Sequence, residues 1–166
     1  MWSNTQQSAR QKLVDEFEFQ TEEIITHIQQ RMNAYEEILR GVQALFNGSE
    51  SVTRNDFRNY INTLRLNQHY PGIHGIGYSP LVRHAEKEQH IAAMRAQGYP
   101  EYTITPAGER ELYTPVIYIE PFAGNNLKAL GYDTHSEPVR QQALLKARDN
   151  DQATLTGKLT LVQEPD

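Results

Sequence analysis

Histidines, cysteines and glycine-rich motifs would carry most catalytic chemistry, and their pattern in this sequence argues against an enzyme. The only helical histidine pair worth testing, His84 and His90, is six residues apart and so points to two faces, whereas zinc-binding helices place two histidines four apart with a glutamate between them. No nucleophile elbow, phosphate-binding loop or dinucleotide fingerprint occurs. The chain has no cysteine, which excludes thiolate catalysis and cysteine-bound metals. We therefore predict a protein that is not an enzyme and that uses no metal or cofactor.

Asp133 is the carboxylate whose position suggests a role. It follows Leu130 to Tyr132 and comes just before a predicted helix that Ser136 caps. One interpretation is that Asp133 caps this helix. The other is that it accepts hydrogen bonds from a ligand at the mouth of an apolar pocket, since small-molecule sites combine apolar walls with a few placed polar groups.

A long helix is predicted for the first 47 residues. Apolar residues recur along it, and from Met32 to Phe46 they are separated by alternating steps of three and four, which is the pattern of a coiled-coil seam. Asn47 and Gly48 are expected to end this helix. A helix of about 43 of these residues extends about 65 Å at 1.5 Å per residue. We expect a stalk that also forms a homodimer; the alternative is an amphipathic helix that lies on its own domain.

The remaining residues predict a compact α+β domain with a mainly antiparallel sheet. Thr53 to Asp56 resembles a capping box that starts a second helix. Further helices and strands follow from hydrophobic periodicity and turn residues. The helices are predicted at 83–97 and 136–149, and the strands at 73–78, 102–105, 112–120 and 153–164. The predicted domains are a stalk helix at 1–50 and a ligand-binding domain at 51–166.

Composition limits the class of partner. The net charge is −5, with 21 acidic and 16 basic residues and no dense basic stripe. Nucleic-acid binding requires clustered positive charge, so a nucleic-acid partner is not expected. No window is apolar enough to span a membrane.

Several segments together resemble the CHASE domain family in its bacterial form. They are the end of the long helix at 39–46, then 54–57, 71–78, 113–118, and 143–149 with 154–157. The resemblance implies an extracytoplasmic sensor, on the periplasmic side of the inner membrane, within a membrane-anchored histidine kinase or diguanylate cyclase. It also implies a PAS-like fold behind the stalk helix and a small-molecule ligand.

The resemblance also implies a site. In the plant cytokinin receptors of this family, an Asp and the backbone of a Leu contact the edge of a purine, and the equivalent positions are Asp133 and Leu155. An adenine-like ligand is therefore one expectation. Strand placement adds Tyr118, Leu130 and Tyr78 as the pocket wall.

Two further expectations concern what completes the molecule. The family pattern continues beyond the last residues of this chain, so we expect the domain to be cut short, with a sheet edge that another chain or a swapped element covers. The alternative to a ligand sensor is a module of such a receptor that binds no ligand and only dimerises or binds a partner protein.

Overall fold

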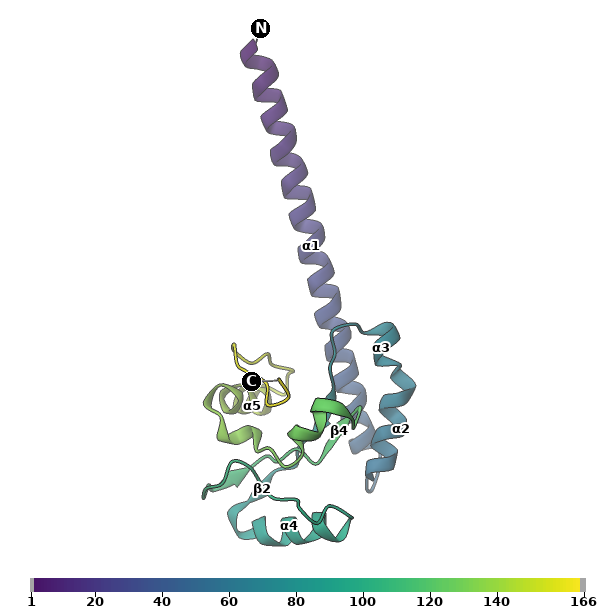
Figure 1. The fold of residues 1–166 in the computed structure, drawn as a ribbon. Helices are drawn as coiled ribbons and strands as arrows, with labels where there is room; N and C mark the ends of the chain where they lie inside the picture. The colour runs from purple at the N-terminus through teal and green to yellow at the C-terminus, as the bar shows by residue number, and fades with distance from the viewer. Residues whose placement is uncertain (1, 165–166) are drawn as a thin grey trace. The chain divides into compact units, whose positions relative to one another are not determined.

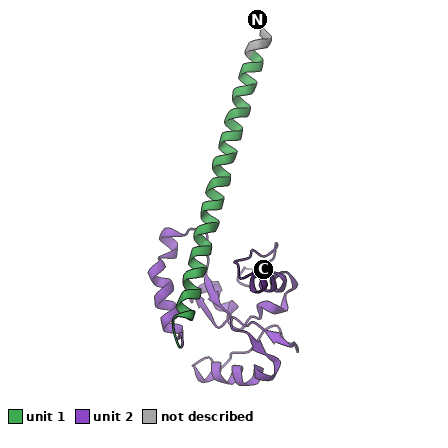
Figure 2. Ribbon diagram, turned by 180° about the vertical axis from the view of Figure 1, so that it is seen from behind, with its two compact units in different colours: residues 1–50 green, residues 51–166 purple. Residues whose placement is uncertain are grey.

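The computed structural model describes residues 2–164, which divide into two compact units with the boundary between Glu50 and Ser51. Figure 2 colours them separately. The first unit contains helix α1, Trp2–Asn47, and the second contains every other element. No helix in the described part of the chain is both long enough and apolar enough to cross a membrane.

Helix α1 is continuous, as the sequence predicts, and much of its apolar surface is exposed. Between Leu13 and Ile28, seven large apolar side chains are 41–70% exposed. These are Leu13, Val14, Phe17, Phe19, Ile24, Ile25 and Ile28. Val14, Phe17, Ile24 and Ile28 recur at heptad spacing, with Thr21 in the remaining position of the seam.

The second unit begins with the predicted capping box. Helix α2, Arg54–Leu64, starts after Thr53, whose hydroxyl accepts from the Asp56 N–H while the Asp56 carboxylate accepts from the Thr53 N–H. Phe57 and Ile61, one turn apart, are its buried residues. Arg65, in a left-handed conformation, ends the helix, and the short helix α3, Leu66–His69, follows.

Two small antiparallel strand pairs form the β structure of residues 2–164, which confirms the α+β class and the antiparallel pairing. Strand β1, Ile76–Tyr78, pairs with β4, Tyr118–Glu120, and β2, Val82–Arg83, pairs with β3, Leu112–Tyr113. The prediction of one strand over 112–120 is wrong, because β3 and β4 have different partners and Pro115, between them, has no N–H for a ladder. Figure 1 shows β2 between α4, Lys87–Ala96, and α5, Pro138–Asn150, while β4 lies toward α2.

One hydrophobic core of the second unit lies between α4 and the β2–β3 pair. Its buried members are Val82, Ile91, Met94, Tyr102, Ile104 and Tyr113. The predicted strand over 102–105 is present only as an isolated bridge from Thr105 to Tyr132. Beside this bridge, Gly131 has φ +81°, and a Cβ there would come within 2.2 Å of the carbonyl oxygen of Thr103. Only glycine fits this crossing of two backbones.

Two predictions near the C-terminus are corrected. Glu137, and not Ser136, caps α5: its carboxylate accepts from the N–H groups of Val139 and Arg140, with Pro138 at the first helical position. The predicted strand over 153–164 is wrong for its described residues, which are irregular, with Leu155 79% exposed. Alternation produces a strand only where a neighbouring strand supplies hydrogen bonds and cross-strand contacts, and none of the described strands pairs with this segment.

Candidate functional site

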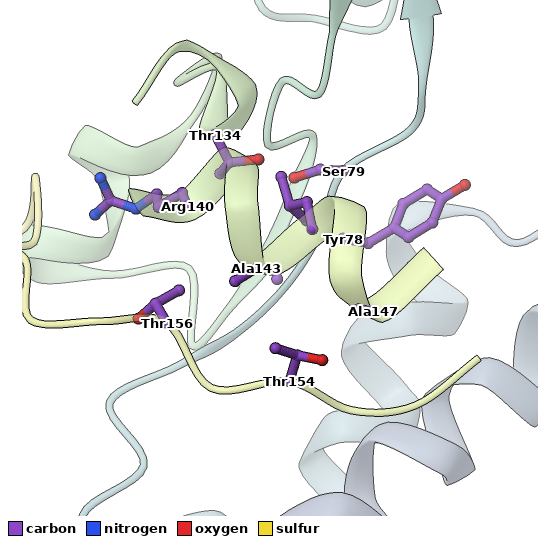
Figure 3. Close-up of a pocket in the computed structure, with 10 residues that line it drawn as sticks. Tyr78, Ser79, Thr134, Arg140, Ala143, Ala147, Thr154 and Thr156 are labelled. Atoms are coloured by element: carbon purple, nitrogen blue, oxygen red, sulfur yellow. The ribbon is translucent and has the colours of Figure 1, made fainter. Parts of the chain in front are cut away.

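A pocket of about 380 Å³ lies beside α5, within the second unit. One wall is α5, the opposite wall is the irregular segment after it, and the end of β1 contributes a third side. Figure 3 shows Ala143 and Ala147 of α5 across from Thr154 and Thr156, with Thr134 and Ser79 nearby. The full lining is Gly77, Tyr78, Ser79, Thr134, Arg140, Ala143, Leu144, Ala147, Thr154 and Thr156.

The α5 wall follows directly from helix geometry. Its four lining residues are spaced i, i+3, i+4 and i+7 from Arg140 to Ala147, so they share one face. Two of them, Ala143 and Ala147, are small, which leaves room beside the helix. This face therefore offers a mostly apolar floor with a cation at its N-terminal end.

Arg140 is the one charged residue of the lining. Its guanidinium lies 5.1 Å from the centre of the Tyr132 ring and donates to the Tyr132 hydroxyl at 3.1 Å and the carbonyl of Thr160 at 3.3 Å. Among residues 2–164 it makes no ion pair with a carboxylate. The nearby Glu137 is engaged by backbone donors: the N–H groups of Arg140 and Val139 hold the pKa of its carboxyl below the usual value.

Asp133 lies behind this pocket and is completely buried. Its Oδ1 accepts from the N–H groups of Thr114 at 2.7 Å and His135 at 3.0 Å, and its Oδ2 accepts from Arg110 Nε at 2.7 Å. Three protein donors thus satisfy a carboxylate with no exposed surface. It caps the 3₁₀ helix Thr134–Ser136, which is the capping alternative, although the capped helix is this short one and not α5.

The role of Asp133 as a ligand acceptor stays a prediction, and the geometry gives it a different position from the expected pocket mouth. The residue after it, Thr134, lines the pocket. The Thr134 hydroxyl is itself held by Thr114, at 2.7 Å from its hydroxyl and 3.1 Å from its carbonyl oxygen. Asp133 and Thr114 therefore fix where this part of the pocket wall lies.

The other four predicted site residues lie in different places relative to the pocket. Tyr78 lines the pocket, and Leu155 is an exposed side chain between Thr154 and Thr156, which line it. Tyr118 is buried behind Tyr78, with ring centres 5.9 Å apart. Leu130 packs on the α4 core and lines a separate hollow of about 360 Å³ with Tyr99 and Tyr102.

Sequence reasoning missed the α5 wall. Arg140, Ala143, Leu144 and Ala147 carry a signal in their i, i+3, i+4, i+7 spacing, but this spacing is also that of any amphipathic helix packed on a core. The small residues at two of these positions are the feature that distinguishes a pocket wall from a packed face. Within the described residues, no group of three or more His, Asp or Glu side chains could hold a metal ion.

Comparison with known proteins identifies the second unit. The family model of the CHASE domain matches residues 50–166, which is more than half of the chain. The chain belongs to the CHASE family. CHASE domains are extracytoplasmic sensor domains of signalling receptors, so the resemblance seen in the sequence is confirmed. A search of curated proteins found no match to the chain.

Proposed function

We propose that this CHASE domain binds a small organic molecule in the α5 pocket and is a binding module without catalytic activity. The observation that carries the proposal is the pocket itself, whose volume of about 380 Å³ falls within the range of small-molecule sites. Its lining combines an apolar helix face with hydroxyl groups and one cation, which is the composition such sites have.

The lining also favours a class of ligand. It contains no acidic residue, and its one charge is Arg140, so a cationic ligand would find no counter-ion while an acceptor-rich or anionic group would find a donor. Purine recognition of the kind found in the plant receptors requires an accessible carboxylate, and Asp133 is buried with three donors bound. We therefore propose a neutral or anionic ligand with an apolar body, and we assign Asp133 to shaping the wall through Thr134.

We further propose that the domain acts at the periplasmic surface of a membrane-anchored histidine kinase or diguanylate cyclase, as a homodimer joined through α1. Exposed apolar side chains at heptad spacing along α1 support the dimer. The alternative is a ligand-free module of the same receptor that only dimerises or binds a partner protein. The open pocket favours the ligand sensor over this alternative.

The test is a thermal-shift screen of the 166-residue chain against purines, amino acids and small organic acids. A ligand at one hundred times its Kd stabilises the folded state by about 2.7 kcal/mol, which is readily measured. The hit is then tested on Ala147→Phe, which fills the pocket, and on Ala92→Phe, which adds the same ring to an exposed position on α4.

We expect a carboxylate or neutral hit to stabilise the natural chain and Ala92→Phe equally and to lose its effect on Ala147→Phe. Replacing Arg140 by Gln should weaken an anionic hit more than a neutral one. A hit that acts equally on Ala147→Phe would refute the site, and a screen in which no compound raises the melting temperature would favour the ligand-free alternative.

A further inference from the structure

Two hydrogen bonds join β4 and the residue just before it to the segment Val52–Arg54, which ends at the first residue of α2. The Tyr118 hydroxyl donates to the carbonyl oxygen of Val52 at 2.9 Å. The Arg54 guanidinium donates to the carbonyl oxygen of Ile117, the residue just before β4. Val52 and Arg54 follow the last residue of the stalk unit, Glu50, by two and four positions. The end of the chain's first unit is thus covalently next to a segment that β4 holds.

The contacts of Arg54 couple the position of the Val52–Arg54 segment to that of β4. Its guanidinium carbon lies 4.5 Å from the ring centre of Tyr99, 5.0 Å from that of Tyr118 and 5.2 Å from that of Phe122. One of its terminal nitrogens, Nη1, is buried without a hydrogen-bond partner. A partly desolvated cation depends on such aromatic faces for its stabilisation, so Arg54 and the Tyr118 ring must move together.

The other side of β4 leads to the pocket. β4 pairs with β1 so that Tyr118 lies opposite Tyr78, and the Ile117 N–H donates to the Tyr78 carbonyl at 3.0 Å. The two rings are 5.9 Å apart. Gly77 and Tyr78 of β1 form part of the pocket wall. One antiparallel pair of strands therefore lies between the pocket and the Val52–Arg54 segment.

We propose that the β1–β4 pair transmits occupancy of the pocket to the Val52–Arg54 segment, with the Tyr118 hydroxyl and the Arg54 guanidinium as the positioning groups. This inference rests on the proposed function, since it concerns the same pocket. An occupant that displaces or orders β1 changes the position of Tyr118 through the ladder and the ring contact. The Val52 carbonyl follows, because it accepts a hydrogen bond from the Tyr118 hydroxyl. Burial raises the pKa of Tyr118, so its hydroxyl remains a donor at neutral pH.

The experiment uses a covalent occupant, so it does not depend on finding the natural ligand. The chain has no cysteine, so Thr154→Cys gives a single thiol on the pocket wall that reacts with N-phenylmaleimide. Hydrogen–deuterium exchange is measured for peptides spanning 50–56 and 76–78, with and without the label. Lys158→Cys, exposed and outside the lining, carries the same label as the control.

We expect the label at position 154 to change exchange of the 50–56 peptide by about two- to tenfold, the range to which one net hydrogen bond of ~0.5–1.5 kcal/mol converts. The label at position 158 should leave this peptide unchanged. In Thr154→Cys with Tyr118→Phe, the label should still alter 76–78 but no longer 50–56. Arg54→Lys, which keeps the charge and loses the forked donor, should also reduce the response.

An unchanged 50–56 peptide after labelling at position 154 would overturn the proposal, as would a full response in Tyr118→Phe. A merely structural role for the hydroxyl would shift basal exchange in 50–56 while leaving the response to the label intact, and that outcome too would overturn it. Failure of the ligand screen would leave these results standing, so the two proposals can fail separately.

Discussion

Asp133 is the residue on which the interpretation of the site depends most. Its carboxylate has no exposed surface and accepts three short hydrogen bonds from other parts of the chain. The fold therefore fixes the position of this carboxylate, and the carboxylate in turn holds those parts of the fold together. It joins three parts of the chain: Arg110, Thr114 just after β3, and the 3₁₀ helix that starts at Thr134. Its substitution is therefore expected to affect the whole second unit and not only ligand contacts.

Asp133→Asn should destabilise the chain strongly. The change removes the charge that pairs with Arg110 and puts an amide N–H₂ where the carboxylate accepts, so a buried donor is left facing a donor. Breaking a buried ion pair from one side costs about 3–5 kcal/mol, and partial hydration of Arg110 places the expectation near the lower end. Urea unfolding followed by circular dichroism measures it.

The matched control is Asp149→Asn, whose carboxylate pairs with Arg148 on an exposed part of α5. Solvent screens that pair, so the unfolding midpoint should not move measurably. Equal midpoints for both variants would mean that the buried network around Asp133 contributes little to stability.

Among the elements, those with local signals were predictable from sequence. The α1 helix, the Thr53–Asp56 capping box and the helices near α4 and α5 depend on residues close in the chain, and all are present. The sequence wrongly predicted a strand at 153–164, because a strand requires a neighbouring strand to pair with, and the local pattern does not encode one. The single predicted strand over 112–120 failed for the same reason, since its halves pair with different strands.

The candidate site, too, could be predicted only in part from the sequence. Asp133 and Leu155 were predicted from positions that match a family pattern, and Tyr78 from strand placement. Tyr78 lines the pocket, as do Thr134 and Thr154, the neighbours of Asp133 and Leu155. The α5 wall was missed because its helix was predicted without knowing which face would lack a packing partner. The burial of Asp133 was missed because Arg110, 23 residues away in sequence, is its ion-pair partner.

The capping box of α2 gives a prediction at the level of one element. Thr53→Ala should destabilise the second unit by about 1 kcal/mol, the usual cost of losing an N-cap side chain. Thr63→Ala is the control: its hydroxyl donates to carbonyls of its own helix and caps nothing, so the loss should be absent or reversed by the helix preference of Ala.

The same variant should alter pH dependence. The Thr53 hydroxyl, followed by its N–H, lowers the pKa of Asp56, so the box contributes stability above the ordinary carboxyl pKa and loses it as pH falls through the lowered value. In Thr53→Ala the Asp56 pKa should rise, and the acid-induced loss should shrink, which NMR titration and unfolding at pH 3 to 7 would detect. An unchanged Asp56 titration would count against the hydroxyl as the main cause.

At the scale of the whole molecule, we propose that α1 determines the assembly. Its heptad-spaced apolar residues between Val14 and Ile28 are exposed, and proteins rarely leave such a stripe in contact with water. We expect sedimentation equilibrium to show a concentration-dependent dimer. Phe17→Lys with Ile24→Lys should shift the chain to monomer, because like charges would then face one another in the seam.

Phe19→Lys is the matched control, since Phe19 is equally exposed but lies two residues from the seam position of Phe17. It should leave the dimer largely intact. Dissociation by Phe19→Lys alone, or a monomeric natural chain at high concentration, would refute α1 pairing through this seam.

Gly131 has a consequence for how this family varies. The backbone there is left-handed and lies so close to Thr103 that any side chain would collide with a carbonyl oxygen. Selection should therefore remove every substitution at this position, whatever ligand a given member senses. Among homologues that keep this fold, we expect the glycine before the Tyr-Asp pair to remain invariant while the pocket residues on α5 diverge with the ligand.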